Sequence, residues 1–478
     1  MSKRLVILFC ALFVFAAAMP AFAAVQNIKV SGDILARYIS RNDFDLLKGN
    51  GVTGEDEIRA FNSVVRLRVD ADLTDNVSTV VRLINERDWT EVTVATTDID
   101  LDLAYVTLKE FLYNPLTLTI GRQELHFGND MIIGDGVGNP VAAAVSGGIG
   151  TNQTTDYQEA PGYTSGVNGD LAYRKAFDAI RATLNYDPLV IDIVYAKISH
   201  ATVTGGESHD DIDLVGANAA YKFSDKWETL AEGYVWSKIN STARRTAGAD
   251  KADRVITIGG RVSTNPTKKL NLQQEIAWQG GKKLRGTNNT IISDRSAWAA
   301  QSVAMLTPGW KCDPTIGMIY SYFSGDADRG AAYTGQDKTY HAWDPMFENQ
   351  TSGHIINALF PQTNVHNIDL MAKLSPMEDV WVQADYVYLL MAKASAITGA
   401  LNMSDYDGSG NTFLKDKQSL GQEFDLNILY NYTEDVQFGL LAGWFWPGKA
   451  YAKTDSGNTG LDQRKTATEA IASCRVVF

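Results

Sequence analysis

Charged and apolar side chains alternate residue by residue along parts of this chain. In one stretch Phe61, Val65 and Leu67 would share one face of a β-strand, whereas Arg66, Arg68 and two aspartates would share the other. Burying such charges unpaired costs several kcal/mol each, so the second face must meet water or a paired network. A strand of this kind does not fit the dry core of a soluble sandwich.

The same alternation recurs from end to end of the chain. It gives about eighteen segments, each close to the roughly ten residues that a tilted membrane strand needs. The segments begin near residues 28, 59, 77, 99, 116, 176, 189, 212, 227, 253, 269, 295, 314, 364, 379, 421, 435 and 466.

The connections between these segments alternate in length. Short connections carry turn residues, as in Asn114-Pro115 and Asp187-Pro188, and long ones rich in Gly, Asn and Asp lie between them. Short turns on one rim and long loops on the other are typical of outer-membrane barrels. The sequence therefore predicts an all-β fold: a single antiparallel up-and-down transmembrane barrel with short periplasmic turns and long extracellular loops.

The N-terminus is predicted to be a secretory signal peptide. Lys3 and Arg4 precede an apolar run that ends before Ala21-Phe22-Ala23, a pattern for cleavage before Ala24. This divides the chain into a signal peptide, residues 1–23, and a barrel, residues 24–478. No later stretch reaches the roughly 18 uninterrupted apolar residues of a membrane helix.

Charge and cysteine content narrow the class further. Loss of Lys3 and Arg4 takes the formal net charge from −13 to −15, which argues against nucleic acid as a partner. Cys312 and Cys474 survive cleavage, and one possible pair cannot staple a chain of this length, so we expect free thiols.

The last stretch, residues 466–478, is predicted to close the barrel by pairing with residues 28–39. It alternates between small or apolar residues and a face that carries Glu469 and Arg475, and it ends on Phe478. It is similar to the closing strand of outer-membrane barrels, which makes the outer-membrane assembly machinery and lipid expected partners.

Several motifs occur in a recognisable order. Residues 121–128 read Gly-Arg-Gln-Glu-Leu-His-Phe-Gly, residues 174–181 read Arg-Lys-Ala-Phe-Asp-Ala-Ile-Arg, Ser324-Gly325-Asp326 follows a predicted strand, and residues 444–448 read Trp-Phe-Trp-Pro-Gly. Together they resemble the alginate-export family of outer-membrane barrels. The resemblance implies an eighteen-strand channel barrel, in agreement with the strand count made from alternation.

The predicted inward face departs from the arginine-rich lumen that the resemblance implies, because its acids outnumber its bases. The fold and channel role carry over, and the solute stays open. The candidate pore-lining residues are Arg37, Arg66, Arg68, Arg82, Asp100, Asp102, Arg122, Glu124, Arg181, Arg261, Glu275 and Asp385. Facing rows of these charges would either orient solutes across the pore or brace the wall as a cross-strand ladder.

Arg122 needs a separate argument. It shares its parity with Leu116, Leu118 and Ile120, which should face lipid. Glycine is the residue expected at a β-bulge, so a bulge at Gly121 is predicted to turn Arg122 into the lumen.

The loops over residues 128–175 and 325–363 are long enough to fold into the lumen, and we expect at least one to narrow it; the alternative is a pair of mobile outer loops. Acidic groups at residues 55–57 and at Asp326 with Asp328 lack calcium-loop spacing and are interpreted as solvated charge.

The function predicted from the sequence is a passive, porin-like channel in the Gram-negative outer membrane. It would pass a hydrophilic solute, with sugars, oligosaccharides and polysaccharides as candidates, selected by pore width and facing charges. No cofactor and no catalytic activity are expected. The alternatives are a barrel that sheathes a partner such as an electron-transfer cytochrome, and an outer-membrane hydrolase.

Overall fold

The computed structural model describes residues 27–44, 46, 57–89, 99–136, 170–199, 212–241, 252–285, 291–326, 339–350, 352–394, 417–451 and 464–478. The predicted signal peptide, the acidic residues Glu55 and Asp56, and Asp328 lie outside these ranges. The division of the chain at residue 24 therefore stays a prediction.

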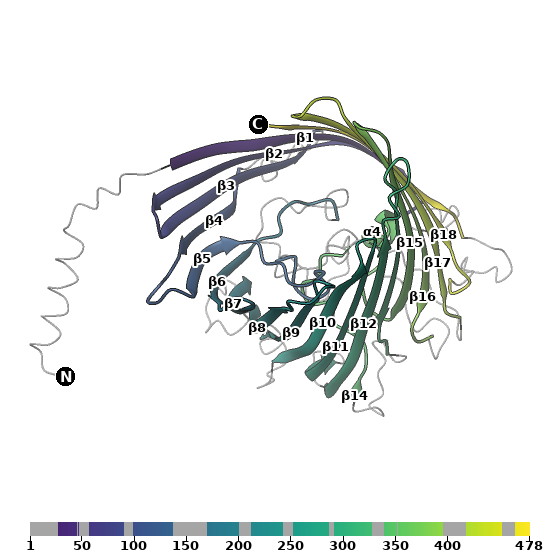
Figure 1. The fold of residues 1–478 in the computed structure, drawn as a ribbon. Helices are drawn as coiled ribbons and strands as arrows, with labels where there is room; N and C mark the ends of the chain where they lie inside the picture. The colour runs from purple at the N-terminus through teal and green to yellow at the C-terminus, as the bar shows by residue number, and fades with distance from the viewer. Residues whose placement is uncertain are drawn as a thin grey trace, which may run out of the picture.

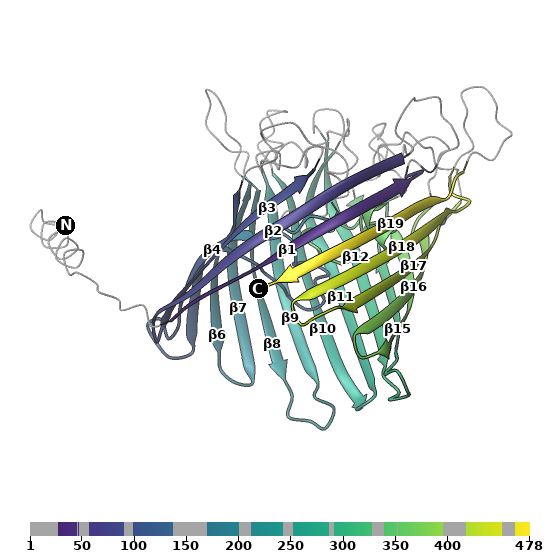
Figure 2. The same cartoon turned by 90° about the horizontal axis from the view of Figure 1, so that it is seen from above.

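Eighteen antiparallel strands form one closed barrel, which confirms the predicted fold class (Figure 1). The first nine are β1 (Asn27–Asn42), β2 (Glu57–Thr74), β3 (Val77–Asp88), β4 (Asp100–Leu108), β5 (Leu116–Gln123), β6 (Phe177–Asn185), β7 (Leu189–Ser199), β8 (Ile212–Lys222) and β9 (Leu230–Asn240). The others are β10 (Asp253–Thr267), β11 (Leu270–Arg285), β12 (Ile291–Leu306), β13 (Thr315–Phe323), β15 (Val365–Met377), β16 (Val380–Met391), β17 (Ser419–Asn431), β18 (Val436–Pro447) and β19 (Ala467–Val477). Neighbours along the chain are neighbours in the wall, and Figure 2 shows them side by side with a strong tilt.

Alternation along each strand produces two chemically different faces. On β1, Ile28, Val30 and Ile34 are exposed on the outside, whereas Asp33 and Arg37 are buried on the inside. The outer face is therefore apolar, as lipid requires, and the polar side chains line the interior. Among the described residues, no helix is long and apolar enough to cross a membrane.

The barrel closes where β19 pairs antiparallel with β1, from Asp33 opposite Val477 to Asn42 opposite Thr468. Beyond this ladder the backbone N–H of Gly32 donates to the carbonyl of Phe478 at 2.8 Å, and the N–H of Phe478 donates back at 3.0 Å. The predicted closure by the last residues of the chain is confirmed.

Two elements were not anticipated. The short strand β14 (Thr339–Tyr340) pairs parallel with β12, and the helix α4 (His354–Leu359) packs inside the wall near β17 and β18. Both belong to the long connection between β13 and β15. Cys312 and Cys474 are free thiols, as expected.

The packing of the Phe478 ring against Gly32 gives a test of barrel closure. A Cβ added at Gly32 would lie 2.6 Å from both the Phe478 ring and the carbonyl oxygen of Arg66. We expect both Gly32→Val and deletion of Phe478 to reduce the amount of assembled barrel severalfold. Assembled barrel is measured on gels of outer-membrane fractions as the form that resists unheated detergent. The molecules that do assemble should conduct normally.

Gly233→Val is the matched control, because a Cβ at this outward-facing glycine would meet nothing within 4 Å. Normal assembly of the Gly32→Val and Phe478-deletion variants would contradict the account of closure.

Candidate functional site

Ion pairs between neighbouring strands line the inner wall from β1 to β5. Arg66 makes two hydrogen bonds to Asp33, at 2.8 and 3.0 Å. Arg82 bonds both Asp102 and Glu124, the latter at 2.6 Å. Each arginine is thus neutralised by a carboxylate on an adjacent strand, so these pairs both brace the wall and line the lumen.

A second set of pairs follows along the wall. Arg181 on β6 bonds Asp192 on β7 at 2.7 Å. Arg261 on β10 bonds Glu232 on β9 and lies opposite Glu275 on β11. Charge on these strands is therefore also arranged as local pairs rather than as a row of one sign.

Parts of both long loops fold inside the barrel. We call residues 125–136, 339–350 and 352–364 the plug. Its two loops are joined by a parallel bridge between Ile133 and Phe347. The N–H of Gly134 donates to the Phe347 carbonyl at 2.7 Å, and the N–H of Phe347 donates to the carbonyl of Ile132 at 3.1 Å. Two loops distant in sequence thus form one unit.

The plug has an apolar core that it shares with the inner wall. Phe127 and Phe347 are buried in one cluster with the wall residues Trp236, Phe177 and Val387. The rings of Phe127 and Trp236 lie 4.9 Å apart, and those of Phe177 and Phe347 lie 5.7 Å apart. Burial of each large side chain contributes about 1.5–3 kcal/mol, so the plug is firmly held. The expectation that at least one loop narrows the lumen is confirmed.

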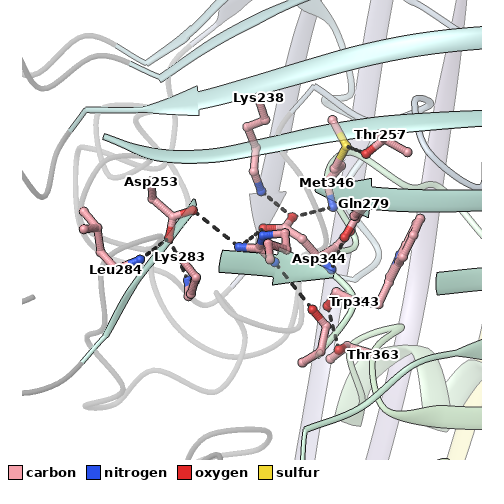
Figure 3. Close-up of polar contacts among 12 residues, drawn as sticks. Lys238, Asp253, Thr257, Gln279, Lys283, Leu284, Trp343, Asp344, Met346 and Thr363 are labelled. Carbon is pink, nitrogen blue, oxygen red and sulfur yellow. Dashed lines mark hydrogen bonds and ion pairs between the residues drawn. The ribbon is translucent and has the colours of Figure 1, made fainter. Parts of the chain in front are cut away.

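Asp344 ties the plug to three strands (Figure 3). Its carboxylate bonds Lys238 of β9 and lies 3.8 Å from Arg295 of β12. Its backbone N–H and C=O both bond the side chain of Gln279 on β11, at 2.8 and 2.7 Å. Arg295 also lies 3.4 Å from Asp253, which extends the network along the wall.

The charge state of Asp344 follows from these neighbours. Burial alone would raise the pKa of this carboxyl, but the cationic Lys238 and Arg295 outweigh burial and lower the pKa well below its ordinary value of 3.8. Asp344 therefore stays ionised whenever the protein is near neutral pH.

Residues 170–174 cover another part of the wall. Arg41 bonds Asp170 at 3.0 and 2.6 Å and Glu469 at 2.6 Å, all three side chains being buried. Arg37 donates to the carbonyl of Leu171 at 3.1 Å. This segment thus links the end of β1 to the start of β19, at the seam where the two strands close the barrel.

The start of α4 is held by two carboxylates of β17. Glu423 accepts the backbone N–H groups of Ile355 and Ile356, each at 2.7 Å, and Asp425 accepts that of His354 at 3.0 Å. These bonds satisfy backbone donors that a helix leaves free in its first turn.

Most of the predicted pore-lining residues lie on the inner face. Those placed there are Arg37, Arg66, Arg68, Arg82, Asp100, Asp102, Glu124, Arg181, Arg261, Glu275 and Asp385. The structure brings Arg82, Asp102 and Glu124 together and places Arg261 beside Glu275. Asp385 stands apart from all of these, on β16.

The prediction that Arg122 points into the lumen is wrong. Arg122 makes two 2.8 Å bonds to Asp178, which is 53% exposed and lies between Phe177 and Ala179, both buried inside. The pairing of β5 with its neighbours has no register shift at Gly121, so the chain's parity is kept and the pair lies outside. Near a barrel rim a lipid-facing arginine costs little, and here it is also paired.

The plug residues were missed by reasoning from sequence. The sequence predicts only a loop around Asp344 and Phe347 and only a strand around the wall residue Lys238. It does not predict that these residues meet. A signal was present, because Met131-Ile132-Ile133 and Ile355-Ile356 are apolar runs inside otherwise polar loops. Apolar runs in a loop indicate that the loop is buried.

The profile of one family, described as Alginate export, matches residues 171–460. The chain belongs to the alginate export family. Among curated protein sequences none gives a match.

Solved outer-membrane proteins share the fold. Outer membrane protein OpdK of Pseudomonas aeruginosa is 9% identical with a TM-score of 0.50, and OccAB3 of Acinetobacter baumannii is 9% identical with a TM-score of 0.52; each comparison covers 95% of this chain and 100% of the other. OccK2 of P. aeruginosa, solved in complex with glucuronate, is 10% identical with a TM-score of 0.50 over 95% of this chain and 99% of the other. This alginate-export family member is an outer-membrane barrel with a channel fold.

Removing the charge of Asp344 should loosen the plug. Asp344→Asn leaves Lys238 buried without its counter-ion and Arg295 with Asp253 alone, and breaking a buried pair costs about 3–5 kcal/mol. We expect hydrogen exchange at the Phe347 and Asn349 amides, which bond across the plug, to accelerate about a hundredfold or more.

Asp294→Asn is the control. Its partner is Lys282 on the outer face, where the two side chains are 65% and 50% exposed, and exposed pairs contribute about 0–1 kcal/mol. Equal exchange in the two variants would show that Asp344 does not anchor the plug.

The plug should also loosen slightly as the pH rises above 6.5. His126 lies 2.9 Å from Asp130, and this hydrogen bond raises the pKa of His126 above its ordinary 6.5. Because the folded pKa is raised, the contribution is complete below pH 6.5 and is lost as the pH rises through the folded pKa.

We therefore expect the Asp130 amide, which bonds the Phe127 carbonyl at 3.0 Å, to lose protection over this range beyond the intrinsic rise in exchange rate. In His126→Gln the extra pH dependence should disappear, and its persistence would assign the effect to another group.

Proposed function

We propose that the protein is a passive outer-membrane channel for small hydrophilic solutes, which it selects by pore width and by facing charged side chains. One observation carries the proposal: the lumen is lined by polar and ion-paired side chains and narrowed by the chain's own plug. A wet, narrowed lumen suits diffusion of single solutes better than passage of a bulky polymer.

Partly exposed pairs on the inner wall supply the selecting charges. Arg68 and Asp70 on β2 remain 35% and 33% exposed while bonded to each other at 2.7 Å. Glu124 and Arg181 are also partly exposed. Since each base has an acid beside it, the net field along this wall is small and we expect weak ion selectivity.

Sugars and their acids are the solute class we favour. OccK2, which has a similar fold, was solved in complex with glucuronate. The family description names alginate, a polymer of uronic acids. Pairing of the arginines here argues against a strongly anionic polymer, because no unneutralised basic row was found on the described inner wall.

The rival hypotheses gain less support. A barrel that sheathes a partner protein needs a lumen wide enough to thread it, and here the chain's own plug takes up that space. For an outer-membrane hydrolase, no specific observation among the described residues speaks in its favour.

Planar-bilayer recording of the purified protein tests the proposal. We expect discrete conductance steps and small reversal potentials in asymmetric KCl. No steps above background at any voltage would overturn the channel function, and a strong anion preference would overturn the pairing argument.

A further inference from the structure

The inner face of β15, β16 and β17 differs from the rest of the wall. It carries four carboxylates, those of Asp369, Asp385, Glu423 and Asp425. Among the described residues, none of the four has a lysine or arginine within ion-pairing distance, unlike inward carboxylates such as Asp33, Asp192 and Glu232. Lys373, on the same face of β15, packs its ammonium group against the Trp381 ring instead, so the four carboxylates form no ion pair with it.

Only part of this acidity is used by the protein. Glu423 and one oxygen of Asp425 hold the start of α4. Asp385 accepts two bonds from Gln383, at 3.1 and 2.9 Å. Asp369 makes no described hydrogen bond, and its Oδ1 and that of Asp425 are buried without a partner.

Asn367 provides an independent sign of an unfilled site. It lies two residues from Asp369 on the same face, it is 2% exposed, and neither its Oδ1 nor its Nδ2 has a partner. A buried polar group without a partner costs about 1–3 kcal/mol, and a buried amide with both ends free is rare. Donor and acceptor capacity thus remain open beside the carboxylates.

Strand register brings these groups together. Asp385 lies directly opposite Asp425 in the pairing of β16 with β17, and Asp369 lies opposite Val387, two residues from Asp385 on the same face. Gly443 on β18 faces Asp425, and a Cβ there would come within 2.6 Å of Asp425 Oδ1. Glycine leaves room for that carboxylate. Asp385, which is only half-buried, is the member within reach of the lumen.

Like charges this close repel unless a proton or a cation lies among them. In the described part of the chain, no group of three or more His, Cys, Asp or Glu residues is arranged to hold a metal ion. Carboxylates spread over three strands, with an amide beside them, suit a larger cation that has several N–H donors. His354, on the plug side, interacts electrostatically with Asp385.

We propose that Asn367, Asp369, Asp385 and Asp425 form a binding site for the ammonium or guanidinium group of a solute in the channel. The proposal rests on the channel function and extends its solute class beyond sugars and sugar acids to solutes that carry a cationic group. The carboxylates hold the N–H donors, and Asn367 adds one further acceptor and one donor for a polar group of the same solute.

Block of single-channel current by 1,4-diaminobutane tests the site. We expect the native channel to be blocked in a concentration-dependent way, with 1,4-butanediol, the uncharged analogue, inactive. In Asp369→Asn/Asp385→Asn the half-blocking concentration should rise about tenfold or more.

The control is Asp192→Asn/Glu232→Gln, which removes two inward carboxylates that already have arginine partners. Its half-blocking concentration should stay within about twofold of the native value. Equally weakened block in both double variants would show a general effect of charge and would overturn the site. A native channel that conducts but is not blocked by 1,4-diaminobutane would also overturn it.

A second experiment separates this proposal from the channel function. The folded barrel, purified in detergent, is titrated with 1,4-diaminobutane in a calorimeter. Binding that is lost in Asp369→Asn/Asp385→Asn supports the site even if no conductance steps are seen. Absence of binding to the native barrel overturns it.

Discussion

A backbone inside lipid has no water to bond, so every N–H and C=O group of a spanning strand needs a protein partner. This chain meets the requirement only because β19 pairs with β1 and leaves no open edge. The rest of the structure depends on that closure. It divides all the side chains into an outer set that meets lipid and an inner set that must find water or partners inside.

The inner set solves this problem in two ways. Along much of the wall, an arginine is placed beside a carboxylate of the next strand, as Arg66 is beside Asp33. Where the plug covers the wall, apolar residues such as Trp236 replace the charges and pack on plug rings. Asp344 joins the two regions, since it carries a charge into the covered zone together with the Lys238 and Arg295 that compensate it. The acidic inner face of β15 to β17 follows neither pattern, which is why it suggests a ligand.

The strands could be predicted from the sequence because a two-residue period is a local property. The predicted strand starts agree with the structure to within a few residues, with β12 beginning at Ile291 instead of near 295. Inward parity was likewise predictable for Arg66, Arg82 and Glu275. Which carboxylate each arginine meets was not, because that depends on register between strands. The prediction for Arg122 was wrong for a related reason. The direction of its side chain depends on whether Gly121 breaks the register, and the ladder continues unbroken.

The plug could not be derived from local pattern, because its core forms between loops more than 200 residues apart, as Ile133 does with Phe347. This plug narrows an otherwise open barrel. Exclusion of neutral polymers of graded size from the conducting channel tests it most directly. The native channel should exclude polymers that enter a variant in which residues 341–350 are replaced by a short Gly-Ser linker. Entry of the same polymers into both channels would contradict the account.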